Sequence, residues 1–327
     1  MDLLTHVLVA YLVTFGIVGP QPQYLAAGAL AGGLPDADAL LFPIARRFPI
    51  FRHHGITHSL FGVSVVAVVG ALLAPMILPG SPWIYFLVME IGGICHILQD
   101  GFTHFSVPPL LPFSERKLEV DADRAINFLT LGVSAVAFYL LLGVERNHVG
   151  PEVYLVTVYG LMAFFAAYFG IRLAGRIAIG RHRAALDPAA VPVPTGNPFT
   201  WLLLAEHHAN GRVRTTWARY QLGRGLVDGP YTVEAPIDGV PHAGSPKSAT
   251  EALEWSYPLA RRTSRVFEMT YHFGEAFETA AGAWTAVWYS LEFTMFGRSS
   301  AVRVRFPPDG GAPEVKSAFY RPIHRAI

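Results

Sequence analysis

Charge is scarce in this sequence. Only 15% of its 327 residues are charged and 52% are hydrophobic, whereas ordinary soluble domains carry about a quarter charged residues. The scarcity is uneven, because residues 1–175 hold nearly all the long apolar runs and residues 181–327 have a mixed composition. This distribution predicts a membrane domain followed by a water-facing domain.

The sequence also has a single cysteine and a net charge close to zero. Cys95 is the only cysteine, so an internal disulfide is excluded. The net charge of +1 gives no support to a nucleic-acid partner. The first residues, MDLLTH, lack the basic region and the cleavage site of a signal peptide, so we expect a retained membrane helix there.

Several apolar runs approach the roughly 20 residues that a membrane-spanning helix needs. Leu3–Val18 is slightly short, and Tyr24–Leu34 is too short to cross before an acidic turn. The full-length predicted spans are Ser59–Leu78, Trp83–Ile97, Ala125–Val144 and Val153–Ala174. The predicted fold is therefore mainly α: a polytopic bundle of about five to six hydrophobic helices, the second short, followed by a small α+β or mainly β domain.

Strand patterns mark the second half of the chain. A proline-rich stretch, DPAAVPVPTGNP, is followed by period-2 or aromatic-rich segments. The expected strands are TWLLLAEHH, TTWARYQL, TAVWYSLEFTMF and AVRVRF, with a hairpin turn at Gly297-Arg298-Ser299; RRTSRVFEMTYHF is ambiguous. The predicted domains are a membrane-embedded domain at 1–178, a linker at 179–198 and a cytoplasmic domain with antiparallel strands at 199–327.

Lysine and arginine are distributed unevenly over the predicted loops. The loops after the first, third and fifth helices hold only Arg146. The loops after the second, fourth and sixth hold Arg46, Arg47, Arg52, Arg116, Lys117, Arg176, Arg181 and Arg183. By the positive-inside rule, the N-terminus and the C-terminal domain then lie in the cytoplasm, and the protein is a multi-pass protein of the cell membrane, in contact with its lipids.

Histidine and carboxylate side chains are the exceptions in the membrane half. Such groups are costly in or beside a span and suggest a function. With the orientation set by lysine and arginine, several segments carry them to one face, and only Glu90 lies nearer to the mid-membrane. The set is His6, Asp36, Asp38, His53, His54, His58, Glu90, His96, Asp100 and His104.

The local geometry of this set fits a metal site. His96 and Asp100 are four residues apart, one above the other on a helix face. Pro35 should interrupt a helix, and if the following chain is extended, Asp36 and Asp38 point the same way. Imidazole and carboxylate without thiolate suit Zn²⁺, Mn²⁺ or Fe²⁺. The predicted ligands of one or two ions are His6, Asp36, His53, His58, His96 and Asp100.

Each of these residues alone also has a simpler interpretation. His6 fits a hydrogen-bonded core residue and Glu90 an interhelix hydrogen bond, while His104 fits a ligand and a loop residue equally well. Independent structural roles would scatter such residues over both faces, so the joint pattern favours a metal site. Asp121 and Asp123 are expected to cap the helix that follows them.

Taken together, these stretches resemble a known family, the membrane-bound metal-dependent hydrolases of the YdjM/YfhP type. The resemblance is carried by His6, PDAD at 35–38, HHGITHSL at 53–60, HILQDGFT at 96–103 and PFS at 112–114. It covers roughly residues 1–175, and NPFTW at 197–201 is similar to the start of the tail in the YfhP branch. The sequence departs from the pattern at His54, where the family usually has Arg, and at Ser106, where it usually has Gly.

The resemblance implies an integral-membrane metal-dependent hydrolase. A distant similarity of such motifs to zinc-dependent phospholipase C implies a His-x-x-x-Asp element, here His96 and Asp100. Asp38, as a general base, and His54 are the predicted catalytic residues. A metal activates a bound water, and a site at headgroup depth favours a lipid or lipid-linked phosphoester as substrate.

A non-catalytic membrane protein that binds metal, either a sensor or a transporter, is the alternative. Transport would need polar residues leading to the outer face, and the outer halves of the helices are almost wholly apolar. This counts against transport but not against sensing. Haem ligation by His6 and His96 would leave the carboxylates without a role.

Overall fold

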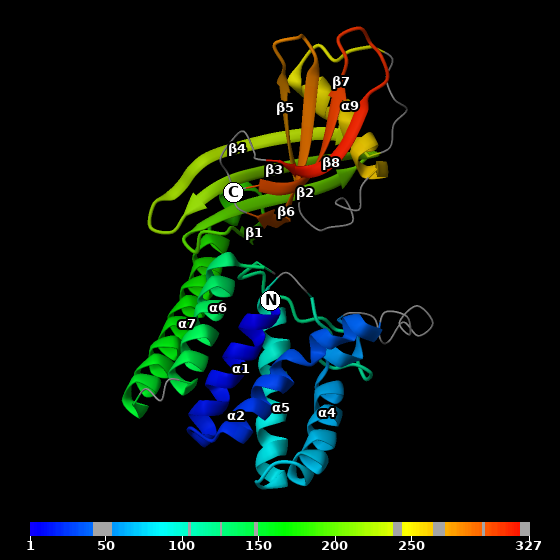
Figure 1. Ribbon diagram of the computed structural model, residues 1–327. Coiled ribbons are helices and arrows are strands. Elements are labelled where there is room, and N and C mark those ends of the chain that lie inside the picture. Colours follow the sequence, from blue (N-terminus) through cyan, green and yellow to red (C-terminus); the bar gives the residue numbers. More distant parts are fainter. Residues whose placement is uncertain are drawn as a thin grey trace. The chain divides into compact units, whose positions relative to one another are not determined.

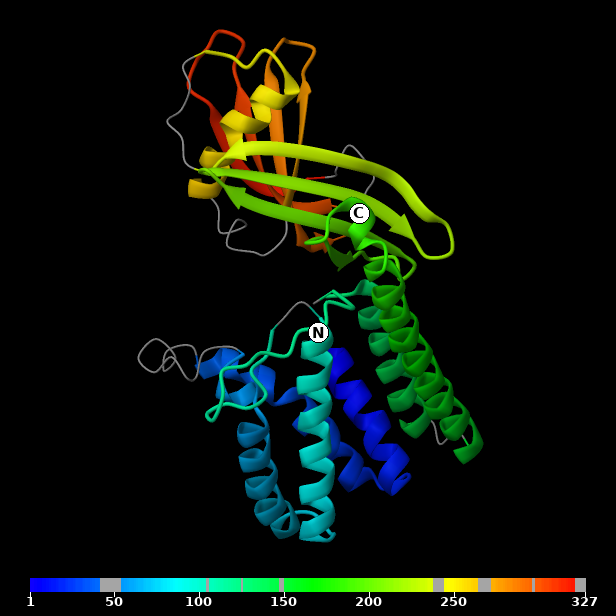
Figure 2. The same ribbon diagram turned by 180° about the vertical axis from the view of Figure 1, so that it is seen from behind.

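The computed structural model describes residues 1–41, 54–103, 106–124, 126–146, 150–237, 244–263, 272–295 and 298–320. The chain divides into two compact units, Met1–Ile171 and Arg172–Ile327 (Figures 1 and 2). The first unit is helical, and the second is built mainly from two antiparallel sheets. The predicted order, a helical half followed by a strand-containing domain, is confirmed at this level.

The predicted apolar runs form α-helices. The elements labelled η are short 3-10 helices, and η1 stands where an extended chain after Pro35 was considered. In chain order the helical elements are α1 (Leu3–Val18), α2 (Pro22–Gly33), η1 (Pro35–Leu41), η3 (Ile56–His58), α4 (Leu60–Leu73), η4 (Ala74–Met76), α5 (Pro82–Phe102), α6 (Phe128–Arg146) and α7 (Pro151–Gly180). The Asp2 carboxylate caps α1 by accepting a hydrogen bond from the Thr5 backbone N–H. Ser59 caps α4 in the same way through the Gly62 N–H. The predicted span from Ser59 is divided between α4 and η4, because Pro75 lacks the N–H that a continuing helix needs.

Two helices in the described part of the chain are long and apolar enough to cross a membrane. They are α5 and α7, the latter with its continuation through Leu186. The apolar helices Leu3–Val18, Leu60–Met76 and Phe128–Gly143 are shorter. The predicted number of five to six spanning helices is therefore not confirmed, although the apolar runs themselves are helical.

Glycine lets α1, α2 and α5 cross closely. A Cβ atom on Gly92 of α5 would stand 2.3 Å from the backbone oxygen of Gly28 on α2. One on Gly32 of α2 would stand 2.4 Å from Cβ of Ala10 on α1. Only the absence of side chains leaves room for such a crossing. As a result, the start of α1, the end of α2 with η1, and the last turns of α5 lie at the same end of the helical unit (Figure 1).

The second unit contains two four-stranded sheets and α9 (Ala249–Thr263), preceded by the short α8 (Arg183–Leu186). The strands are β1 (Val191–Pro194), β2 (Thr200–Ala209), β3 (Arg212–Gln221) and β4 (Gly225–Pro236) in the first sheet, and β5 (His272–Glu278), β6 (Trp284–Met295), β7 (Arg298–Phe306) and β8 (Glu314–Tyr320) in the second. Trp217 of β3 packs on Phe273 of β5, with ring centroids 5.1 Å apart. The indole N–H of Trp288 donates to Ser256 Oγ on α9 at 2.8 Å. Both sheets and the helix therefore share a core.

Parts of this unit differ from the prediction. β1 lies inside the stretch expected to be a linker. It stands at the edge of its sheet and pairs with β2. Its prolines, Pro192 and Pro194, lack a backbone N–H, and an edge strand tolerates this loss of a hydrogen-bond donor. The sequence did not indicate α9, which carries Pro258 in its interior, nor β4 and β8. The ambiguous segment supplies the end of α9 and the start of β5, and its residues 264–271 lie outside the described part. Of the expected hairpin turn, residue 297 also lies outside it, and the two following residues begin β7.

Gly92→Ala should lower the midpoint of thermal unfolding. The new methyl group meets backbone rather than a movable side chain, and overpacking of this kind costs roughly 1–3 kcal/mol. The matched control is Gly132→Ala on α6, where nothing lies within 4 Å of the added Cβ and the midpoint should stay level or rise slightly. Melting of both variants in detergent measures the difference. Equal midpoints would contradict the close crossing.

Candidate metal centre

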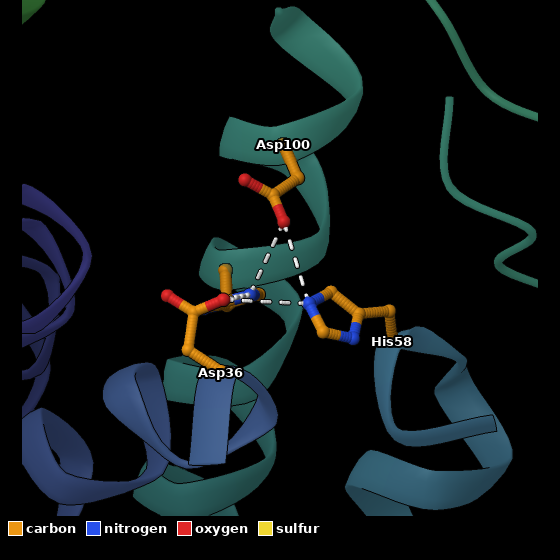
Figure 3. Close-up of side chains that lie close together, drawn as sticks. Asp36, His58 and Asp100 are labelled. Atoms are coloured by element: carbon orange, nitrogen blue, oxygen red, sulfur yellow. Dashed lines mark ion pairs between the residues drawn. The ribbon is translucent and has the colours of Figure 1, made fainter. Parts of the chain in front are cut away.

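Four side chains from three separate segments converge at the end of the helical unit. Asp36 lies in η1, His58 ends η3, and His96 and Asp100 lie on successive turns of α5. One possible ligand atom from each lies within 4.8 Å of the others. Figure 3 shows Asp36, His58 and Asp100 directed toward a common point. Four of the six predicted metal ligands therefore meet in space.

The distances between these atoms leave room for a shared cation. His96 Nε2 lies 3.3 Å from Asp100 Oδ2 and 3.7 Å from Asp36 Oδ1. His58 Nε2 lies 3.5 Å and 3.6 Å from the same two oxygens. These four distances are close to the roughly 3.4 Å between ligands that stand about 2.1 Å from a tetrahedral ion, and all four atoms lie within 4.8 Å of one another. Small side-chain movements would bring the four ligands onto one ion.

Burial supports the same interpretation. His96 is 0% and Asp100 1% exposed. His96 Nε2 and Asp100 Oδ2 make no hydrogen bond within the described residues. A buried polar atom left without a partner costs roughly 1–3 kcal/mol, and more when it is charged. A cation at the common point would satisfy both atoms, so the residues present fit a divalent metal ion.

The backbone of α2 fixes the orientation of His96. The ring Nδ1 lies 2.8 Å from the carbonyl oxygen of Gly32. A carbonyl only accepts hydrogen bonds, so Nδ1 carries the proton and donates it. Nε2 is then the unprotonated nitrogen, with its lone pair directed toward Asp36 and Asp100. This contact depends on the close crossing of α2 and α5. It could not be predicted from a side-chain motif, because the acceptor is a backbone carbonyl.

Asp38 stands behind His58. Its Oδ2 lies 3.2 Å from His58 Nδ1 and accepts a hydrogen bond from Thr57 Oγ1 at 2.7 Å. A carboxylate on the far nitrogen of a ligating histidine is a common arrangement at metal sites. The sequence suggested Asp38 as a general base; the structure places it on the side of the ring opposite to the converging atoms. Its geometry is that of a positioning residue, and the Thr57 hydroxyl holds it in place.

The protonation states of Asp36 in η1 and His58 in η3, two segments outside the apolar helices, favour the binding of a cation. Burial alone would lower the pKa of His58, but hydrogen bonds to Asp36 and Asp38 outweigh it and raise the pKa to about 9. Burial would raise the pKa of Asp36, but the hydrogen bond with His58 holds it below its ordinary value. The site without metal therefore keeps Asp36 ionised and a proton on His58, and a metal ion would displace that proton.

The other predicted residues lie beside the four. His6 stacks on His96 with ring centroids 3.9 Å apart, and its Nε2 lies 3.1 Å from Asp100 Oδ1, the oxygen that is not part of the cluster. His54, at a backbone φ of +59°, places Nε2 3.8 Å from Asp100 Oδ2. The α-amine of Met1, which sequence reasoning missed, pairs with Asp100 Oδ1. Two predicted residues lie outside the described part of the chain: His53 and His104.

Two acidic groups outside the centre have structural roles. Glu90 accepts a hydrogen bond from Ser64 Oγ at 2.8 Å between α5 and α4, as its simpler interpretation predicted. Asp123 accepts hydrogen bonds from Asn127 Nδ2 at 3.0 Å and Tyr168 OH at 2.6 Å, which tie α7 to the segment before α6. The helix that Asp123 was expected to cap begins later, at residue 128, and Asn127 accepts the capping hydrogen bond.

The helical half of the chain matches a known protein family. The YdjM inner membrane protein family matches residues 1–176. This chain belongs to that family. The match includes all the residues of the candidate centre, agrees with the resemblance seen in the sequence and supports a membrane location for this YdjM family member. Comparison with curated proteins and with solved structures finds no match.

Asp38→Asn should weaken Zn²⁺ binding roughly 10- to 100-fold, because it removes the carboxylate that orients His58. Affinity is measured by competition with a chelating indicator on detergent-purified protein. The matched control is Glu90→Gln, which alters a carboxylate paired with Ser64 outside the centre and should bind like the wild type. Wild-type affinity in Asp38→Asn would contradict the positioning role.

Zn²⁺ affinity should rise with pH. Below the pKa of about 9, His58 is protonated in the absence of metal, and binding must displace that proton. One displaced proton makes the apparent dissociation constant fall about tenfold per pH unit until the pKa is reached, after which it levels off. The same competition assay, run from about pH 6 to about pH 8, tests this. A flat profile would show that His58 does not bind the ion.

Proposed function

We propose that this protein is an integral-membrane metal-dependent hydrolase that acts on a lipid or lipid-linked phosphoester. The observation that carries the proposal is the convergence of Asp36, His58, His96 and Asp100, each with one possible ligand atom within 4.8 Å of the others. Structural zinc sites are mostly built from cysteine, whereas histidine and carboxylate are typical of catalytic ones. Zn²⁺ is the ion that this donor set fits best, with Mn²⁺ and Fe²⁺ as the alternatives.

The centre has one open side. The side chain of Asp36 is 22% exposed, whereas those of His58 and Asp100 are 0% and 2% exposed. Catalytic zinc sites usually have three protein ligands and a water, and they can expand to five ligands. With four protein ligands in this centre, water would take a fifth position on the open side. Asp36 marks the side on which water and substrate reach this centre.

The bound ion would supply a water of lowered pKa and polarise the scissile group. The protein's own residues do the remaining work. His96 and His58 keep their Nε2 atoms toward the ion because Gly32 and Asp38 hold the opposite ring nitrogens. His54, partly exposed and within 3.8 Å of Asp100 Oδ2, is the proposed proton donor to the leaving group.

Position supports the substrate class. The centre lies where α1 begins and α2 and α5 end, so in a bilayer it sits at the depth of the lipid headgroups. The distribution of lysine and arginine assigns this face to the cytoplasm. A phosphoester attached to a lipid is the reactive group held at that depth.

The test is hydrolysis by the full-length protein in mixed micelles. Long-chain phosphatidic acid is the first substrate, with Zn²⁺, Mn²⁺ or Fe²⁺ supplied in turn, and phosphate release is measured. Activity should be lost with a chelator and in His96→Ala, while Glu90→Gln should keep it. His54→Ala should keep the metal and lose about 100-fold in kcat.

Metal binding without hydrolysis would point to the alternative function. A protein that binds the ion stoichiometrically but hydrolyses no phosphoester in a broader panel would be a metal-binding sensor, and the hydrolase proposal would fail.

A further inference from the structure

An apolar pocket of about 80 Å³ lies in the helical unit beside the metal centre. Its walls come from α2, η1, η3, α4 and α5, and they include Leu34, Ile56, Thr57, Val63, Val66 and Met89. Thr57 carries the one polar side chain among the lining residues. The pocket therefore offers a hydrocarbon surface with a single hydroxyl group.

Two residues of the pocket lining are neighbours of ligands. Pro35 and Thr57 line the pocket, and each directly precedes a residue of the centre, Asp36 and His58. The hydroxyl of Thr57 donates to Asp38 behind His58. The segments η1 and η3 thus contribute both to the pocket and to the centre.

One lining residue of the pocket belongs to the exposed surface of α4. Val66 lines the pocket and is 38% exposed, and the neighbouring Val65 and Val69 on the same helix are 48% and 49% exposed. In a membrane protein an apolar face of this kind contacts acyl chains. Val66 therefore joins the pocket lining to an exposed apolar surface of α4.

The size and chemistry of the pocket argue against a single hydration site and against a cavity filled with several waters. A water molecule needs roughly 10–15 Å³ of such volume, so the pocket is several times too large to be a single hydration site. Its lining offers water few hydrogen-bond partners, and apolar cavities of this kind stay dry and take apolar ligands. Protein interiors otherwise contain few voids larger than one water molecule.

We propose that this pocket holds the first methylene groups of one hydrocarbon chain of the substrate, so that the phosphoester attached to that chain lies on the metal centre. The reaction rests on the proposed hydrolase function, whereas the binding of the chain does not. Because the chain is equally apolar in the bilayer and in the pocket, selection depends on shape. The pocket favours a slender chain over a bulky ring and sets the register of the phosphoester.

Photo-crosslinking tests the chain site without requiring turnover. The full-length protein in lipid nanodiscs is exposed to phosphatidic acid with a diazirine on one acyl chain, and labelled residues are mapped by mass spectrometry. Label should appear at Leu34, Val63 and Met89. It should be lost from them in Val66→Trp, which fills the pocket, and kept in Val65→Trp, the same change one residue away on the exposed face.

The overturning result is label confined to exposed residues of α4 such as Val65 and Val69, or equal pocket labelling in both tryptophan variants. Because Val65→Trp carries the same bulky side chain on the same helix, a general disturbance of folding would affect it as well. Each variant is also melted beside the wild type, so that a loss of label in an unfolded protein is not counted.

Turnover separates this inference from the proposed function. The ratio of long-chain phosphatidic acid hydrolysis to p-nitrophenyl phosphate hydrolysis should fall in Val66→Trp and stay at the wild-type value in Val65→Trp. An unchanged ratio in Val66→Trp would overturn the chain site and leave the hydrolase standing. Pocket labelling in a protein that hydrolyses neither compound would overturn the hydrolase and leave the chain site standing.

Discussion

The close crossing of α2 and α5 is the constraint on which the candidate centre depends. Gly92 allows the two backbones to approach until a single methyl group on it would collide with the Gly28 carbonyl. That approach places the Gly32 carbonyl against His96 Nδ1 and so fixes the tautomer that presents Nε2. It also brings η1, which directly follows α2, to the last turns of α5. Helix packing in the apolar part of the molecule and ligand geometry at its end are therefore one arrangement.

The centre concentrates groups that an apolar bundle would otherwise exclude. Buried carboxylates and imidazoles lose hydration, and their mutual contacts recover this loss only in part. Asp36 and Asp100 face His58 and His96 at 3.3–3.7 Å, distances at which direct hydrogen bonding is incomplete and an intervening ion fits. A metal ion would bind all four groups at once, whereas without it His96 Nε2 and Asp100 Oδ2 make no hydrogen bond within the described residues.

Much of this could be predicted from the sequence. The apolar runs predicted the helices because their length and hydropathy depend only on local sequence, and the four-residue spacing of His96 and Asp100 placed them on one helix face. The role of Asp38 could not be predicted, since the side of an imidazole that a carboxylate approaches is decided by tertiary packing. The same holds for the Gly32 carbonyl, which has no side chain to reveal it. In the second unit, α9 and the edge strand β1 were not predicted. Both contain proline, which lacks a backbone N–H and therefore makes a helix or strand appear unfavourable when only the local sequence is considered.

The central claim, that these four side chains hold one metal ion, is tested most directly by elemental mass spectrometry of detergent-purified protein. The wild type is measured beside an Asp36→Ala/His96→Ala double variant and beside Glu90→Gln, each shown to be folded. The account predicts stoichiometric divalent metal in the wild type and in Glu90→Gln, and its loss from the double variant. Equal metal content in all three, or none in the wild type after supplementation with zinc, manganese or iron, would contradict it and leave the cluster as a buried polar network.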